Sequence, residues 1–327
     1  MQWIRAFLTG RTQRVVVDGA ASDPAPVISE VPHGSVLGPV LFLVFINDLP
    51  LQVSSQCRLF ADDCIVYREV GCLPDCDKLQ KDLTSLAEWE LKWGMSFHPE
   101  KCSILRVHRK MSPLHFDYSL KGHTLAAETS SKYLGVSITS KLTWSDHVDK
   151  ISKKGNSALG FLRRNLRISN ETTKAAAYKT FVRPSLEYCS TVWNPHNDTE
   201  VRKIEMVQRR AARYVTGRHH NTSSVTSMLQ HLQWETLESR RTKAQVAMLY
   251  KIINGLVDIR PEDHITRAPT RPRSPNDHQY RKFSTKTTYR QKSFFPRTVD
   301  VWNSLPSSIV NAPSFVSLKQ GLADYNF

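Results

Sequence analysis

The sequence predicts an α+β protein in which antiparallel hairpins and helices are followed by an all-helical region. In the first 138 residues, short β-branched segments alternate with turn residues, a pattern typical of strands and hairpins. From Trp144 onward, apolar residues recur at helical spacing instead. The charge changes near the same point: residues 1–138 hold 14 Lys/Arg and 15 Asp/Glu, whereas residues 139–327 hold 31 and 15.

The first elements are a hairpin and a helix. Residues 11–18 are rich in valine and end at Gly19, and residues 27–31 form a second short apolar segment, so we expect the two to pair. The apolar run 36–46 has 11 residues, well short of the roughly 20 that a membrane helix needs. It predicts a buried helix with Ser35 as its N-cap.

A second hairpin is predicted at residues 57–70, where apolar residues flank Asp62 and Asp63. Successive side chains on a strand point to opposite faces, so adjacent carboxylates converge on one ion only at a turn. Carboxylates at a hairpin apex can hold Mg²⁺, which prefers oxygen ligands. Aspartate is also favoured in turns for purely structural reasons, so the pair alone does not identify a metal site.

The remaining elements of the first part are a helix and short strands. Residues 75–93 carry leucines at helical spacing and end at Gly94, which predicts a helix with a glycine cap. Residues 103–107 predict a strand. Residues 133–136 predict a turn between two strand-like segments.

The second part predicts four helices, at residues 145–166, 171–182, 199–216 and 226–254, interrupted at Pro184, Pro195 and Gly217. Two of them place apolar residues on one face and basic residues on the other. A basic surface of this size favours a polyanionic partner such as nucleic acid, with a merely soluble surface as the alternative. The outward cations are Lys153, Lys154, Arg163, Arg164, Arg209, Arg210 and Arg213.

The end of the chain and the cysteines predict little chemistry. Residues 260–297 are rich in Pro, Arg and Ser and predict a flexible basic linker, after which the aromatic segment 293–306 docks back on the core. Six cysteines without a secretion signal predict reduced thiols in an intracellular protein, with no structural metal. The sequence predicts no contact with a membrane and leaves the oligomeric state open.

Four ordered motifs then point to a family. They are VPHGSVLGP at 31–39, FADD at 60–63, WGMSF at 93–97 followed by Lys101, and YLGV at 133–136. This series resembles motifs B, C, D and E of jockey-like reverse transcriptases from non-LTR retrotransposons. Further segments resemble the same family: TGRTQRVVVDG at 9–19, LTWSDHV at 142–148, RPSLEYCSTVWNP at 183–195, IEMVQRRAARY at 204–214 and SFFPRTVDVWNSLP at 293–306.

The resemblance implies a fold and a role for each site residue. The fold would be a partial right-hand polymerase, with a palm at 1–138, a helical thumb at 139–259, and a basic linker and C-terminal segment at 260–327. Asp62 and Asp63 would be the Mg²⁺ ligands, and Lys101 would lie near the triphosphate. The other roles concern nucleotide and template binding by Gly34 and Ser35, and a primer grip formed by Leu134 and Gly135.

Each implied role has a structural alternative. Gly34 could be only a turn residue, Lys101 only a solvated cation, and residues 133–136 only a packed hairpin. The family usually has glutamine where this chain has His33, which would alter template contacts. The implied partners are an RNA template, a DNA primer and deoxynucleoside triphosphates.

The expected first catalytic aspartate, which the family takes from motif A, does not occur in the sequence. Two-metal phosphoryl transfer needs carboxylates that hold both ions. The resemblance therefore implies an RNA-directed DNA polymerase fragment that is the C-terminal part of the enzyme and inactive in isolation. The alternatives are a non-catalytic nucleic-acid-binding fragment and a decayed gene copy.

Overall fold

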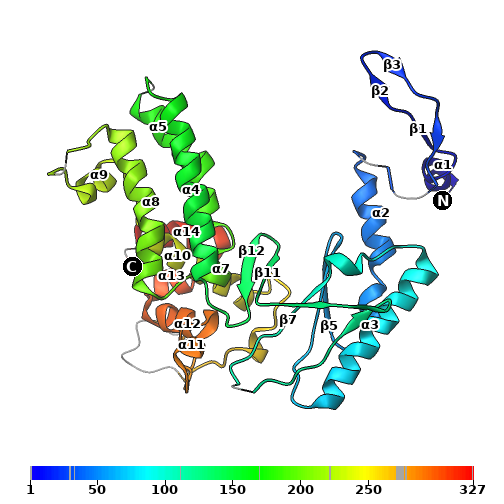
Figure 1. Ribbon diagram of the computed structural model, residues 1–327. Helices are drawn as coiled ribbons and strands as arrows, with labels where there is room; N and C mark the ends of the chain where they lie inside the picture. Colours follow the sequence, from blue (N-terminus) through cyan, green and yellow to red (C-terminus); the bar gives the residue numbers. More distant parts are fainter. Residues whose placement is uncertain are drawn as a thin grey trace. The chain divides into compact units, whose positions relative to one another are not determined.

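The structure, a computed structural model, describes every residue except 1, 29, 30, 33, 111, 169, 221, 270–275, 277 and 326. The chain forms two compact units, residues 1–129 and residues 130–327. The first combines small hairpins with helices, and the second is mostly helical (Figure 1). The predicted α+β class is confirmed.

The elements of the first unit are short apart from one long helix. In chain order they are α1 (Gln2–Leu8), β1 (Thr12–Gln13), β2 (Val16–Val17), β3 (Ala20–Ala21), β4 (Ala25–Pro26), α2 (Leu37–Ile46), η1 (Leu49–Gln52), β5 (Gln56–Phe60), β6 (Asp63–Tyr67), α3 (Leu73–Trp93), η2 (Pro99–Lys101), β7 (Ser103–Leu105), β8 (Ser119–Leu120), β9 (His123–Thr124) and β10 (Ala126–Glu128).

The first hairpin closes earlier than the sequence predicted. Asp18 and Gly19 both have positive φ, 50° and 85°, and Val17 pairs with Ala20 across them. Two consecutive positive φ values are typical of a two-residue hairpin turn. The return strand is therefore made of β3 and β4. Among the described residues, the expected pairing of 11–18 with 27–31 holds only at Val27, whose N–H donates to Arg11 O at 2.9 Å, while residues 29 and 30 lie outside the described residues.

Helix α2 forms where predicted, but it is not buried. The N-cap residue is Val36 and not Ser35 as predicted, although Ser35 Oγ, one residue earlier, accepts a hydrogen bond from the Gly38 N–H at 2.9 Å. Ile46 packs into a cluster with Leu86 and Trp89 of α3. Among the described residues of the first unit, one side of α2 has such partners, whereas Val44 on the other side is 72% exposed.

The predicted hairpin at 57–70 and helix at 75–93 are confirmed as β5–β6 and α3. Gly94 caps α3 in a left-handed conformation with φ 68°, and its N–H donates to Glu90 O. Strand β7, also predicted, pairs in parallel with β10.

Asp82 ties the β5–β6 hairpin to α3. This carboxylate is 5% exposed and accepts hydrogen bonds from the N–H groups of Ser54 and Ser55 at 2.7 and 2.9 Å. Arg68 lies 3.8 Å from the same carboxylate. Burial by itself raises the pKa of Asp82, but the hydrogen bonds from both serines outweigh it and hold the pKa below its ordinary value of 3.8.

The second unit begins with one hairpin and continues as helices. Its elements are β11 (Ser130–Tyr133), β12 (Val136–Thr139), α4 (Ser145–Asn165), α5 (Glu171–Ala177), the π-helical turn η3 (Tyr178–Val182), α6 (Arg183–Glu187), α7 (Ser190–Trp193), α8 (Asp198–Thr216), α9 (Val225–His231), α10 (Leu237–Ile253), η4 (Pro261–Asp263), α11 (Thr288–Gln291), α12 (Phe294–Ser304), α13 (Ser307–Val310) and α14 (Phe315–Asp324). No helix in the described residues is long and apolar enough to cross a membrane.

Helices α4 and α8 lie side by side and run in the same direction (Figure 1). Near their N-terminal ends, Lys203 pairs with Asp149 at 2.6 Å. Near their C-terminal ends, the Tyr214 hydroxyl donates to Leu162 O at 3.1 Å. Contacts that advance together along both helices establish the parallel orientation.

Gly155 lies where α4 meets α6 and α8. A Cβ at this position would lie 2.9 Å from Leu186 Cδ2 and 3.2 Å from Val207 Cγ1. Both neighbours are fully buried, so neither side chain has free space into which to move. The absence of a side chain at Gly155 therefore sets how closely the three helices pack.

Two helix boundaries differ from the sequence prediction. The expected single helix at 226–254 is two helices, α9 and α10, separated at Gln233, which has φ 52°. The helical chain does not break at Pro184 as expected. The π-helical turn η3 shifts the hydrogen-bonding pattern just before it. Helix α6 then starts at Arg183, so the proline lies in its first turn, where it is tolerated.

The described residues of 260–297 pack against the core instead of forming a flexible linker. Ile265 and Tyr280 belong to a second hydrophobic cluster, with Trp302 of α12 and Leu249 of α10. Asn276 is 2% exposed and donates to Leu305 O at 2.8 Å. Amino-acid composition alone did not reveal these few anchoring side chains. The predicted docking of residues 293–306 on the core is confirmed, and they include α12.

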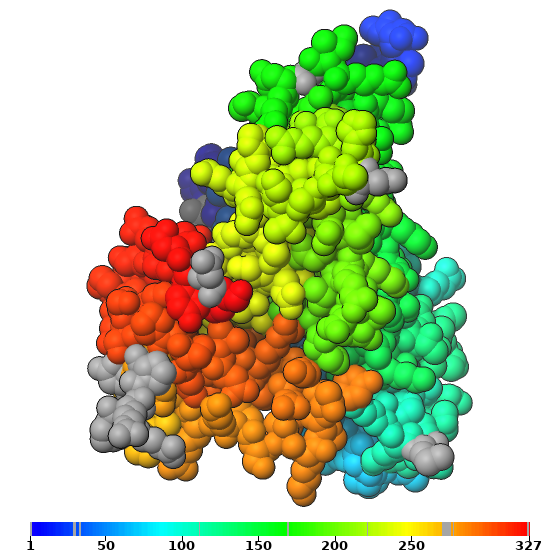
Figure 2. All heavy atoms as spheres, turned by 90° about the vertical axis from the view of Figure 1, so that its left-hand side faces the viewer, coloured from blue at the N-terminus to red at the C-terminus, as the bar shows by residue number. Residues whose placement is uncertain are grey.

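Helix α10 connects the two hydrophobic clusters of the second unit. Leu237 packs in the first cluster, and Val246 and Leu249 pack in the second. In Figure 2, the yellow-green residues of α8 to α10 accordingly border the orange and red C-terminal helices. The C-terminal segment is thus part of the helical unit.

Replacing Gly155 by valine should lower the free energy of unfolding of the helical unit by about 2 kcal/mol, because the new methyl groups overlap buried Leu186 and Val207. Gly160→Val is the matched control, since a Cβ there meets only the end of the Arg164 side chain at 3.5 Å. Thermal unfolding followed by far-UV circular dichroism compares the two. Equal melting temperatures would contradict the packing constraint.

Replacing Asp82 by asparagine should destabilise the β5–β6 hairpin by about 2 kcal/mol, through loss of charge-assisted hydrogen bonds from Ser54 and Ser55. The rate of amide hydrogen exchange at residues 54–67 measures this loss of stability. The control is Asp77→Asn, at an exposed position of α3, in which these amides should exchange at the wild-type rate.

The Asp82 carboxylate also makes the protection of the β5–β6 hairpin against hydrogen exchange depend on pH. Because the folded-state pKa of Asp82 is depressed, its stabilisation is complete above the ordinary pKa of 3.8 and is lost as the pH falls through the folded-state value. The Asp82→Asn variant should lack this acid-dependent component. An identical acid response in wild type and variant would rule out the assignment.

Candidate functional site

The two predicted metal ligands lie at the apex of the β5–β6 hairpin. Phe60 pairs with Asp63, which leaves Ala61 and Asp62 as a two-residue turn. Both aspartates are exposed. The expected exposed apex is therefore present, and the two carboxylates lie on consecutive residues where the chain reverses.

Ala61 adopts a conformation that alanine rarely takes. Its φ is 51°, in the left-handed region that costs a non-glycine residue about 1 kcal/mol or more. Such outliers persist where the surrounding structure holds them, and they are concentrated at functional sites. The turn that carries Asp62 is therefore held by the paired strands on either side of it.

The described residues supply only part of a metal site. Asp62 and Asp63 offer oxygen donors of the kind that Mg²⁺ accepts. Within the described part of the chain, no three His, Cys, Asp or Glu side chains come together in a way that could hold an ion. The pair fits as two members of a larger ligand set.

Gly34, before α2, and Gly38, in the first turn of α2, have different roles. Gly34 has φ 75° and open space around it, so its requirement is conformational. At Gly38 a Cβ would lie 2.9 Å from Pro32 O, so it is Gly38 that allows close backbone approach. The Ser35 hydroxyl bridges Pro32 and Gly38, donating to Pro32 O at 2.8 Å and accepting from Gly38 N–H. His33 lies outside the described residues.

Lys101 ends the short helix η2. Its N–H donates to His98 O at 2.9 Å, and its side chain is exposed. The structure thus presents the ammonium group to solvent just before β7, and its role near a triphosphate stays a prediction.

In the second unit, the predicted primer-grip residues form the turn of the β11–β12 hairpin. Tyr133 pairs with Val136 across Leu134 and Gly135, which have φ 45° and 85°. A turn of this kind usually carries Asn-Gly, so leucine is an unusual first residue. The Tyr188 hydroxyl donates to Leu134 O at 3.0 Å, a contact that sequence periodicity did not reveal.

The predicted phosphate-binding cations lie mainly on the outer faces of α4 and α8. Six of them are exposed, and Arg213 is half-buried. Arg210 donates to Asn156 Oδ1 of α4 at 2.9 Å. Among the described residues, no acidic partner neutralises any of the seven, which are Lys153, Lys154, Arg163, Arg164, Arg209, Arg210 and Arg213.

Five of these cations, Arg163, Arg164, Arg209, Arg210 and Arg213, lie in the C-terminal halves of the parallel helix pair, whereas Lys153 and Lys154 lie near the middle of α4. The acidic residues Asp149 and Asp198 lie in the N-terminal halves of α4 and α8 and pair with Lys203 and Arg202. Because both helices run in the same direction, their basic C-terminal halves lie together. This arrangement concentrates positive electrostatic potential over a limited surface, and a phosphate backbone would be attracted most strongly there.

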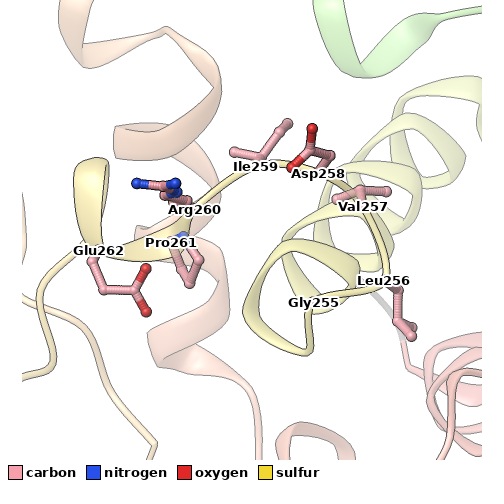
Figure 3. A pocket seen from close by; sticks show the side chains of 8 residues that line it. All are labelled: Gly255, Leu256, Val257, Asp258, Ile259, Arg260, Pro261 and Glu262. Atoms are coloured by element: carbon pink, nitrogen blue, oxygen red, sulfur yellow. The ribbon is translucent and has the colours of Figure 1, made fainter.

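The hollow shown in Figure 3 is lined by none of the predicted site residues. It is lined by the consecutive residues 255–262 after α10, including apolar Leu256 and Ile259. None of the side chains with predicted chemistry contributes to it, so the carboxylate apex, the β11–β12 turn and the basic helix ends stay the candidate sites.

Comparison with known proteins agrees with these motifs. Residues 1–138 match the family described as reverse transcriptase (RNA-dependent DNA polymerase). The RNA-directed DNA polymerase from mobile element jockey of Drosophila melanogaster is 27% identical over 226 residues, which cover 65% of this chain and 25% of the relative. The probable RNA-directed DNA polymerase from transposon X-element of the same species is 29% identical over 231 residues, covering 65% and 24%.

A third relative is covered more fully. The retrovirus-related Pol polyprotein from type-1 retrotransposable element R1 2 of Nasonia vitripennis is 25% identical over 248 residues, which cover 69% of this chain and 58% of the relative. The chain spans about a quarter of the length of the jockey and X-element polymerases. No solved structure matches it.

Proposed function

We propose that this chain carries part of the reverse transcriptase domain of a jockey-like, non-LTR retrotransposon, and that it supplies part of the polymerase metal site and part of the template–primer surface. The observation that carries the proposal is the pair of adjacent, exposed carboxylates at a two-residue turn, inside the segment that matches the family.

The proposed division follows the motif order. We assign the partial palm to residues 1–138, the helical thumb to 139–259 and the C-terminal segment to 260–327. The compact units divide between residues 129 and 130. The proposed primer-grip hairpin is therefore built on the same unit as the thumb helices, so its position depends on them.

Each site residue has a proposed task. Asp62 and Asp63 bind Mg²⁺, which when bound stabilises negative charge on transferring phosphoryl oxygens. The Gly34–Ser35 segment lies beside the incoming deoxynucleotide and template, and Lys101 beside its triphosphate. The Ser35 hydroxyl is engaged by Pro32 and Gly38, so its contribution is to shape the backbone there.

The basic ends of α4 and α8 bind the phosphate backbone of an RNA template paired with a DNA primer. Arg163 and Arg164 lie on α4, and Arg209 and Arg213 on α8. Each phosphate that such a cation neutralises releases counterions, which makes binding salt-dependent and independent of sequence.

The 327-residue chain alone should show no primer extension on an RNA template with Mg²⁺ or Mn²⁺. The reason is that Asp62 and Asp63 form only part of the ligand set, and the described residues bring no third ligand to them. Extension of a labelled DNA primer, followed on a denaturing gel, tests this. Robust incorporation that Asp62→Ala abolishes would overturn the prediction, whereas incorporation that survives Asp62→Ala indicates a contaminating polymerase.

Replacing Arg209, Arg210 and Arg213 together by glutamate should weaken binding to an RNA–DNA hybrid at least about tenfold at low salt and flatten the salt dependence. The loss should be equal for unrelated sequences, because phosphate contacts carry no sequence information. Fluorescence anisotropy at several salt concentrations measures both effects.

A matched pair of variants locates the surface. Arg209→Glu/Arg213→Glu and Arg202→Glu/Lys203→Glu change the net charge equally on the same helix, but the second pair lies at the acidic end beside Asp198 and Asp149. Only the first should lose most of the affinity. Equal losses would show that net charge, and not the position of the cations, determines binding.

A further inference from the structure

The turn between β11 and β12 has an unusual support. Leu134 and Gly135 both adopt positive φ, and leucine has no polar side chain with which to stabilise that conformation. Hairpin turns of this type normally rely on Asn, Asp or Gly. The support must therefore come from another part of the chain.

Tyr188 provides that support. Its hydroxyl donates to Leu134 O at 3.0 Å, and a Cβ on Gly135 would lie 3.3 Å from Cε1 of its ring. One tyrosine thus contacts both turn residues from a position more than fifty residues along the chain. A side chain at Gly135 would make this contact tight enough for the ring or the turn to shift by a few tenths of an ångström.

Tyr188 is itself held firmly by its backbone. It follows α6, where its N–H donates to Pro184 O at 2.9 Å, and its carbonyl accepts a hydrogen bond from Trp193 Nε1 at 2.7 Å. Trp193 and Leu186 are fully buried in the first core of the second unit. The backbone of Tyr188 is therefore anchored in that core.

The Tyr188 side chain, in contrast, is 58% exposed. An exposed hydroxyl could bond to water at little cost, so the core does not require this contact for stability. Its effect is to set the position of the turn. The exposed ring and Leu134 also present an apolar surface at the tip of the hairpin.

We propose that Tyr188 is the positioning residue of the primer grip, fixing the Leu134–Gly135 turn and contacting the sugar and base of the primer's 3′-terminal nucleotide. Aromatic rings stack on bases of any sequence, which suits a primer end that changes at every step. The inference rests on the proposed function, because it assumes that this hairpin meets the primer.

The test compares two RNA–DNA hybrids of equal duplex length, one blunt and one with a recessed DNA 3′ end. The basic helix ends contact both, whereas only the recessed hybrid presents its DNA 3′-terminal nucleotide as a primer does, with template continuing beyond it. The intact chain should prefer the recessed hybrid. Tyr188→Ala should abolish this preference and leave affinity for the blunt hybrid and the melting temperature unchanged.

Two further variants separate the hydroxyl from the ring. Tyr188→Phe keeps the ring and loses the hydrogen bond, and it should reduce the preference roughly 2- to 10-fold. Phe181→Ala removes another exposed aromatic side chain, seven residues earlier, and should keep the full preference.

The outcomes distinguish the inference from the proposed function. If the intact chain binds neither hybrid, the proposed nucleic-acid-binding function fails. If it binds both equally, or if Tyr188→Ala keeps the preference for the recessed end, the function stands and the role of Tyr188 is overturned.

Discussion

Close packing at Gly155 is the constraint on which the helical unit depends. Because that position has no side chain, α6 and α8 approach α4 closely enough for Leu186 and Val207 to fill the space. On either side of this contact, Asp149 pairs with Lys203 and Leu162 O accepts from Tyr214, so the two helices run in parallel and their basic C-terminal halves lie together. The packing at Gly155 also places α6, and with it Tyr188, beneath the β11–β12 turn. The packing of three helices thus determines both the proposed phosphate-binding surface and the proposed primer grip.

The β5–β6 and β11–β12 hairpins, which contain the candidate metal ligands and the candidate primer-grip residues, share one structural feature. Each reverses over two residues and places a non-glycine residue, Ala61 or Leu134, in the left-handed region. Each is held by contacts outside the turn, from Asp82 at the base of the first hairpin and from Tyr188 at the tip of the second. Strain of this kind persists only where the surroundings hold it, so both tips are sites of defined geometry on a supporting structure.

Sequence patterns predicted most of the local structure and part of the site. The β5–β6 hairpin, α3, α4 and α8 follow directly from turn residues and from apolar periodicity, which act over a few residues. The predictions failed where distant contacts decide. Composition could not reveal that Asn276 and Tyr280 are buried against α12, or that the apolar run in α2 keeps Val44 exposed.

By itself, the sequence determined the family, the order of the motifs, the adjacent carboxylates and the uneven distribution of charge. These properties belong to consecutive residues, and folding does not change them. Only the tertiary structure decided that Gly38 lets two backbone segments approach closely, and that the basic C-terminal halves of α4 and α8 lie together. It alone brought Tyr188 to the Leu134–Gly135 turn. The physical reason is that helix packing brings together residues about fifty positions apart, and no local pattern records which of them will meet.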